Sequence, residues 1–129
     1  MVEVHVTMSL ENRVRIAEGI KRATSRRRPL GKVGDYFALH KHAPQLIRFY
    51  EFTAVEQMPV DEVARYHYSE EGYGYPEEFR REWVLITNLW RKRYATPEKP
   101  AVVYEWNPEE DVYFHLFRLL RTTLDRWGE

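Results

Sequence analysis

The chain has 129 residues, of which 43% are apolar and 31% are charged, and its formal net charge is zero. This length and composition are typical of one globular domain. The absence of cysteine excludes disulfide scaffolds, cysteine nucleophiles and thiolate zinc sites. No apolar run approaches the roughly 18 residues of a membrane-spanning helix, and the first residues alternate rather than form a leader, so we expect no membrane partner and a cytoplasmic location.

The first third of the chain predicts a strand, a short helix and a turn. Residues 2–8 alternate apolar and polar side chains, which is typical of a half-buried strand. Ser9 can cap a helix over residues 10–18, and Gly19 is well placed to end it. Residues 22–28 lack helical spacing. The Gly-Asp pair at 34–35 then predicts a turn before a strand over residues 36–39.

The rest of the chain predicts two strands and three helices. Residues 46–58 read as a long strand or a hairpin that Pro59 closes. Asp61 can cap a short helix that runs to about residue 66, and Pro76 suits the first position of a longer helix. Residues 101–106 predict a compact strand. A last helix is expected over residues 107–129, with an apolar stripe formed by Tyr113, Leu116, Phe117, Leu120, Leu124 and Trp127.

Strands separated by helices of unequal length favour an α+β fold, with a small, partly open β-barrel and flanking helices, over a parallel doubly wound sheet. We divide the chain into a domain over residues 1–106 and an extra C-terminal helix over residues 107–129. That helix packs on the domain or forms a dimer face. The chain is therefore expected to be a monomer, or a homodimer through its last helix.

Charge is segregated along the chain although the total is neutral. Residues 13–32, the basic segment, carry Lys and Arg opposed only by Glu18, whereas residues 51–82, the acidic segment, are as clearly acidic. A local basic face is sufficient to attract phosphates. The alternative is that the two segments neutralise each other in the fold.

Two short motifs lie in and near these segments. From Gly19 the sequence has the form G-x-K-x-x-T-x-R, which contains Lys21, Thr24 and Arg26, and a Gly-Asp turn follows it. A Glu-Gly-Tyr turn at 71–73 precedes the helix that begins Pro-Glu-Glu-Phe. In this order the motifs, together with a closing strand at 102–106, resemble the ASCH family, whose members look like PUA-type RNA-binding barrels. The resemblance covers about residues 2–106 and implies a domain that binds RNA or a nucleoside.

The resemblance also implies an alternative activity. In some small ASCH proteins a Lys, a Thr and a Glu form the catalytic set of an amidohydrolase that deacetylates N4-acetylcytidine, and these residues correspond to Lys21, Thr24 and Glu71. A Thr hydroxyl needs a base to act as nucleophile, and a partly buried Lys can be that base. Glu71 could orient the Lys or carry a proton. Neighbouring arginines would lower the pKa of Lys21 and Glu71 would raise it, and the sequence leaves the balance open.

Two further readings of the same residues stay open. Other ASCH proteins look like ribonucleases, and Lys21 with the arginines could stabilise charge during phosphodiester cleavage. Lys21 and Glu71 could instead form a purely structural ion pair.

The ligand, RNA or a modified nucleoside, is expected in a cleft between the basic segment and the Glu71 turn. Arg26 would hold a phosphate or a developing oxyanion, and Tyr73 would stack on a base. The other candidates for ligand binding are Arg22, Arg27 and Arg28. No cofactor is implied. His40, His42 and His67 lack a carboxylate at a motif spacing, so no metal site is expected.

Overall fold

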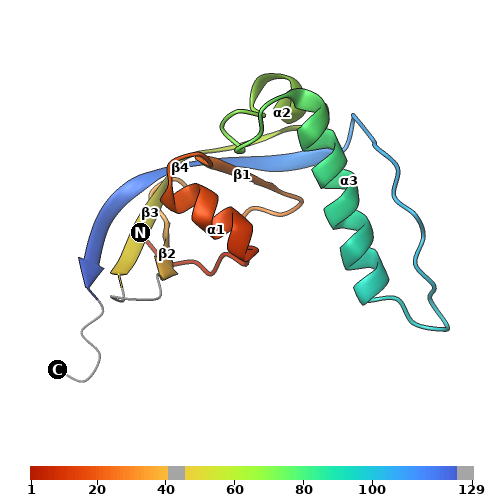
Figure 1. Cartoon of the computed structure of the whole chain (residues 1–129), viewed down its shortest axis with the longest axis horizontal. Coiled ribbons are helices and arrows are strands. Elements are labelled where there is room, and N and C mark those ends of the chain that lie inside the picture. The colour runs from red at the N-terminus through yellow and green to blue at the C-terminus, as the bar shows by residue number, and fades with distance from the viewer. Residues whose placement is uncertain (41–45, 125–129) are drawn as a thin grey trace.

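The computed structural model describes residues 1–40 and 46–124, which form an open four-stranded sheet and three helices (Figure 1). The elements in chain order are α1 (Leu10–Ala17), β1 (Ala23–Arg26), β2 (Tyr36–His40), β3 (Leu46–Pro59), α2 (Val60–Tyr66), α3 (Pro76–Arg93) and β4 (Asp111–Leu124). The strand order is β1-β4-β3-β2, and each neighbouring pair is antiparallel. The predicted α+β class, with a barrel-like sheet that is not closed, is confirmed.

Two apolar clusters hold the layers together. The first joins α2 and the start of α3 to the sheet through Val63, Phe79 and Phe114. The second joins α1 and the N-terminal segment to the sheet through Ile16, Met8 and other buried side chains, chiefly aromatic. Side chains alternate between the faces of a strand, so the middle of the sheet is covered on both sides. The helix expected to begin near Asp61 begins at Val60, and the longer helix begins at Pro76 as predicted.

The helix predicted over residues 107–129 is wrong, because residues 111–124 form β4, between β1 and β3. Val112 and Phe114 contribute to the first cluster and Phe117 to the second. A strand buried on both faces reads as a continuous apolar run, and periodicity alone does not distinguish such a run from a helix. Residues 111–124 therefore contain no helix that could form the predicted dimer face. Residues 125–129, with Trp127, lie outside the described residues.

Residues 2–8 do not form the predicted strand. They make one parallel bridge, between Glu3 and Tyr36, in which Val4 N donates to Tyr36 O at 2.8 Å. The carboxylate of Asp35 accepts a hydrogen bond from Val2 N at 3.0 Å and so holds the start of the segment. The segment leads into α1, where the Ser9 hydroxyl accepts from Asn12 N at 3.2 Å, as its predicted capping role requires.

The strand predicted over residues 101–106 is also absent. This stretch runs back along α3 in Figure 1, and its backbone is satisfied by a side chain of the helix rather than by a neighbouring strand. Tyr104 N donates to Asn88 Oδ1 at 2.8 Å, and Asn88 Nδ2 donates to Tyr104 O at 3.1 Å. Val102 and Val103 remain exposed. Among the helices of the described ranges, none is long and apolar enough to cross a membrane.

Candidate functional site

A glycine turn at the end of α1 brings Lys21 into the interior. Gly19 has φ of 77°, and its N–H donates to Ile16 O at 3.0 Å. Ile20 N donates to Arg15 O at 2.9 Å, which completes a Schellman motif. This reversal confirms that Gly19 ends the helix. It directs the chain into β1, so that Lys21 is only 4% exposed.

A second glycine turn brings Glu71 to the same place. Glu70 O accepts hydrogen bonds from Arg22 N at 2.7 Å and from Ala23 N at 2.9 Å, which fixes the turn against the start of β1. Gly72 follows with φ of 98°, and a Cβ built there would lie 3.2 Å from Lys21 Cβ. Only glycine combines this φ with so close an approach. The backbone conformation and the close contact with Lys21 therefore explain why a glycine follows Glu71 directly.

Lys21, Glu71 and Ser25 form a buried polar cluster. Lys21 Nζ donates to Glu71 Oε1 at 3.2 Å and to Glu71 O at 3.1 Å. Ser25 Oγ donates to Glu71 Oε2 at 2.8 Å. The carboxylate thus has a partner on each oxygen, in a position where it is 4% exposed. A buried charge without such partners would be costly, so the three side chains hold one another in place.

The pKa of Lys21 is lowered from its ordinary value. The largest cause is burial, which penalises the ammonium form, while attraction to Glu71 and their hydrogen bond oppose the change. Repulsion from Arg26 and Arg15 lowers the pKa further. The sequence left open whether the arginines or Glu71 would dominate the pKa of Lys21; in the structure, burial is the largest effect and lowers it. A lysine in this state releases its proton more readily than an exposed one.

Thr24 lies on the other face of β1 from Ser25, and its neighbours differ accordingly. Its hydroxyl accepts from Arg26 Nε at 3.3 Å. Arg26 Nη2 also donates to Thr7 O at 2.9 Å, which ties β1 to the N-terminal segment. Both hydrogen bonds of Lys21 Nζ within the described residues go to Glu71. The structure therefore brings Lys21 and Glu71 together and pairs Thr24 with Arg26.

The remaining arginines of the basic segment have different surroundings. Arg27 is held in place: it donates to both carboxylate oxygens of Glu110, at 3.1 and 3.2 Å, and to Thr87 Oγ1 at 2.8 Å. Its guanidinium also lies 4.6 Å from the centre of the Trp83 ring. Arg22 and Arg28 are exposed, and no side-chain hydrogen bond or ion pair engages either of them in the described part of the chain.

The two charged segments do not neutralise each other. Among ion pairs of the described residues, Lys21–Glu71 is the one that joins the basic segment to the acidic segment. Glu51 pairs with Arg118, and Asp61 pairs with Arg65 and Arg80. Within the basic segment, Arg22 and Arg28 therefore keep their charge available for an external anion.

Tyr73 is only half-buried and sits between packed groups. Its ring meets Phe79 edge-on at 5.7 Å, and the Arg15 guanidinium lies 5.6 Å from its centre. Burial, together with the nearby Glu71 carboxylate, raises the pKa of its hydroxyl. The ring is thus positioned beside the Lys21–Glu71 pair, partly covered.

Sequence reasoning missed two site residues, Ser25 and His115. Lys21, Ala23 and Ser25 follow period-two spacing, so continuing the strand pattern from Lys21 would have placed Ser25 on the Glu71 side. His115 was hidden within the predicted helix. It is fully buried, with Nδ1 3.1 Å from Thr24 O and Nε2 accepting from Leu30 N at 2.9 Å. Burial lowers its pKa, so a neutral imidazole anchors β1.

No cluster of three or more His, Cys, Asp or Glu suited to a metal ion occurs in the described ranges. His67 stacks on Phe114 with ring centres 4.4 Å apart, and its Nδ1 lies 3.6 Å from Glu70 Oε2. His42 lies outside the described residues.

The open sheet with its three helices is an α+β arrangement that recurs in known structures. An ASCH domain from Lactobacillus crispatus matches with a TM-score of 0.60 and 12% identity, over 92% of this chain and 78% of that chain. A mutant of ZmASCH from Zymomonas mobilis matches with a TM-score of 0.55 and 18% identity, over 95% and 73%. A protein from Enterococcus faecalis, attributed to family DUF984, matches with a TM-score of 0.61 and 20% identity, over 92% and 75%.

The chain therefore has the fold of ASCH-domain proteins, and the resemblance predicted from the motifs is confirmed at the level of the fold. No family model and no curated protein matches its sequence.

Proposed function

We propose that this protein binds RNA, or a modified nucleoside within RNA, on the basic side of β1 next to the Glu71 turn. The observation that carries the proposal is that Arg22, next to the buried Lys21 in sequence, and Arg28, two residues after the end of β1, are exposed without a neutralising partner in the described residues. Phosphates are attracted to such unpaired guanidinium groups whatever the base sequence. The fold shared with an ASCH domain agrees with the motif resemblance from which this class of ligand was expected.

The neighbouring side chains suggest how a ligand would be oriented. Arg26 is fixed by Thr24 and Thr7, so its charge is presented from a defined position. Tyr73 offers an aromatic edge near the Lys21–Glu71 pair for contact with a base. Arg27 would contribute less to binding, because Glu110 already pairs with its guanidinium.

Binding of a fluorescent single-stranded RNA, followed by anisotropy, tests the proposal. Arg28→Ala should weaken binding and reduce the slope of log K against log salt by about one, as the loss of one phosphate contact does. The matched control is Arg65→Ala, which removes the same charge from α2, where Arg65 Nε pairs with Asp61 Oδ2 at 2.7 Å. If the two changes weaken binding equally, the effect comes from net charge alone, and the assignment of Arg28 to the RNA-binding surface is wrong.

A second candidate function is hydrolysis of an acylated cytidine such as N4-acetylcytidine. The observation that favours it is the lowered pKa of Lys21, caused chiefly by burial, with the Glu71 carboxylate 3.2 Å from Nζ. This reaction requires Thr24 Oγ1, which here accepts from Arg26 Nε, to come within reach of Lys21 Nζ, so that it attacks the acetyl carbonyl while Lys21 takes its proton. The cytosine amine would leave with a proton, and water would then release acetate from the threonine ester.

Incubation with N4-acetylcytidine, followed by chromatography for cytidine, separates this activity from simple binding. Turnover that disappears in Lys21→Ala, Thr24→Ala and Glu71→Ala would assign the three residues as a catalytic set. If the unmutated protein produces no cytidine, N4-acetylcytidine is excluded as its substrate. Analysis of RNA fragments in the same samples tests the ribonuclease alternative.

A further inference from the structure

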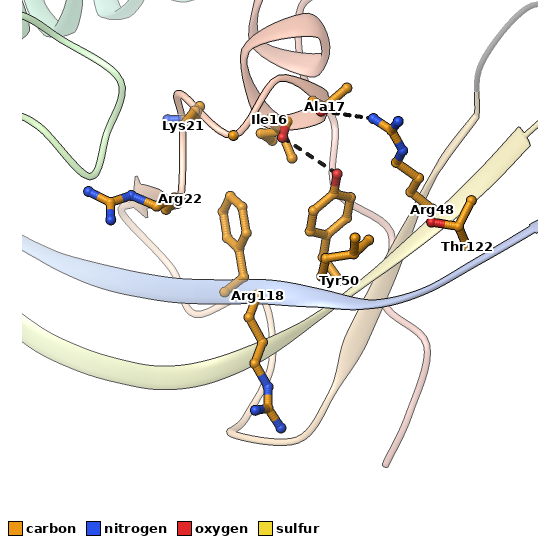
Figure 2. A pocket seen from close by; sticks show the side chains of 11 residues that line it. Ile16, Ala17, Lys21, Arg22, Arg48, Tyr50, Arg118 and Thr122 are labelled. Atoms are coloured by element: carbon orange, nitrogen blue, oxygen red, sulfur yellow. Dashed lines mark hydrogen bonds between the residues drawn. The ribbon is translucent and has the colours of Figure 1, made fainter.

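A cavity of about 430 Å³ lies between the end of α1 and the strands β3 and β4 (Figure 2). Its volume is within the range of small-molecule sites, which are typically about 300–1,000 Å³. The apolar part of its lining comes from Ile16, Tyr50, Phe117 and Leu119. The Tyr50 and Phe117 rings meet edge-on at 5.8 Å, and both side chains are only 5% exposed. The wall is therefore preformed and rigid.

The polar part of the lining is cationic. Figure 2 shows Arg22 at one end of the cavity and Arg48 at the other. Arg118 also lines it, but Glu51 accepts two of its hydrogen bonds, at 2.8 and 2.6 Å, and neutralises its charge. No carboxylate is among the lining residues.

Two of these charges remain uncompensated. Arg48 Nη1 donates to Ala17 O at 2.8 Å, a neutral carbonyl that fixes the guanidinium without cancelling its charge. Arg22 is exposed and has no side-chain partner in the described ranges. A concave apolar wall with two uncompensated guanidinium groups attracts a ligand that is apolar on one side and anionic on another.

We propose that this cavity is a second binding site, which takes a small phosphate monoester of a flat organic group, such as a nucleoside monophosphate. The flat group lies against the wall of Tyr50 and Phe117, and Arg22 and Arg48 neutralise the phosphate. Arg22, which has no partner to release, turns toward the ligand. Lys21 also lines the cavity, but both hydrogen bonds of its ammonium go to Glu71, so Arg22 and Arg48 are the cations left for the phosphate.

Isothermal titration with cytidine 5′-monophosphate, cytidine and inorganic phosphate tests the proposal. The monophosphate should bind at least tenfold more tightly than either cytidine or inorganic phosphate, because only it uses both the wall and the cations. Arg22→Gln and Arg48→Gln should each weaken its binding by about tenfold or more, the usual effect of losing one charge-assisted contact. Arg65→Gln, the same change on α2, should leave binding unaltered.

Arg48→Gln could loosen the end of α1, because Arg48 bonds Ala17 O. Arg22→Gln has no such effect, because the Arg22 side chain has no partner in the described structure, so it tests the site independently. Arg28→Ala, which should weaken RNA binding, should not change the affinity for the monophosphate, so failure of one proposal is distinguishable from failure of the other. Undetectable binding of the monophosphate, equal affinities for the three compounds, or indifference to both pocket variants would each overturn this inference.

Discussion

At the scale of single residues, the candidate site depends on how closely Gly72 approaches Lys21. The positive φ of 98° and the 3.2 Å from a notional Cβ to Lys21 Cβ leave no room for a side chain. A Cβ there would push on the stem of the lysine whose ammonium pairs with Glu71. Backbone geometry and ion-pair geometry are therefore coupled at this position.

Gly72→Ala is predicted to lower the free energy of unfolding by about 1–3 kcal/mol, through the strained φ and displacement of Lys21. Urea denaturation followed by circular dichroism measures the change. Gly74→Ala is the matched control, because nothing lies within 4 Å of its notional Cβ and its φ is not positive. It should alter stability by less than about 1 kcal/mol. Equal losses in the two variants would contradict the account of the turn.

The lowered pKa of Lys21 has a definite sign in the pH dependence of stability. Burial makes the folded chain release this proton at a lower pH than the unfolded chain, whose lysine has the ordinary value of 10.5. Between those two pKa values the unfolded chain binds more protons, so the free energy of unfolding rises with pH. Below that window the contribution is a constant cost.

Lys21→Met should remove this rise. The prediction is that, as pH rises through the lowered pKa of Lys21 toward the ordinary lysine value, the unmutated protein gains stability relative to the variant. Burial raises the pKa of both Tyr50 and Tyr73, so they act in the opposite direction in alkali. Both are present in either protein, and the difference between the two urea curves cancels them. If the difference in stability between the two proteins does not change with pH across this range, the pKa of Lys21 is not lowered.

Sequence reasoning found the site residues that belong to a recognisable family motif. Lys21 and Glu71 are fifty positions apart, and only the pattern of a known family placed them together; the structure joins them at 3.2 Å. Ser25 escaped because a serine in a strand has no distinctive spacing. The binding and catalytic roles assigned to the site residues stay predictions.

At the scale of elements, tertiary contacts outweighed local pattern in three places. β4 was expected as a helix because its centre is apolar on both faces, and strand burial on two sides removes the alternation that would reveal it. Residues 2–8 keep their alternation but pair with Tyr36 at one bridge only. Residues 101–106 have strand-like composition, but Asn88 of α3 supplies the hydrogen-bond partner of the Tyr104 backbone instead of a neighbouring strand.

The packing of residues 101–106 on α3 gives a prediction of its own. Asn88 makes both hydrogen bonds that hold the Tyr104 backbone, at 2.8 and 3.1 Å. Asn88→Leu leaves that N–H and that C=O without their partner, at a cost of about 1–3 kcal/mol for each group that stays buried. Hydrogen exchange of the Tyr104 amide should accelerate markedly while amides in β4 keep their protection.

Lys92→Ala is the control for this change. It substitutes an exposed residue of the same helix and leaves the Asn88–Tyr104 bonds in place. Unchanged exchange at Tyr104 in Asn88→Leu would show that the hydrogen bonds do not hold the segment to the helix.

At the scale of the whole molecule, positive and negative charges are concentrated in different segments although the net charge is zero. The formal net charge is zero, yet the acidic segment forms its ion pairs largely with arginines outside the basic segment. Arg22 and Arg28 thus remain unneutralised among the described residues. If the protein binds RNA as proposed, these local charges and not the net charge attract the phosphates, so the affinity is expected to fall as salt rises.

That dependence tests the central claim most directly. The affinity for a single-stranded RNA is measured at a series of salt concentrations, for the unmutated protein and for Arg28→Ala. The account predicts a linear fall of log K with log salt, with a slope about one unit shallower in the variant. An affinity that is indifferent to salt, or a slope that the substitution leaves unchanged, would contradict RNA binding by the basic face of β1.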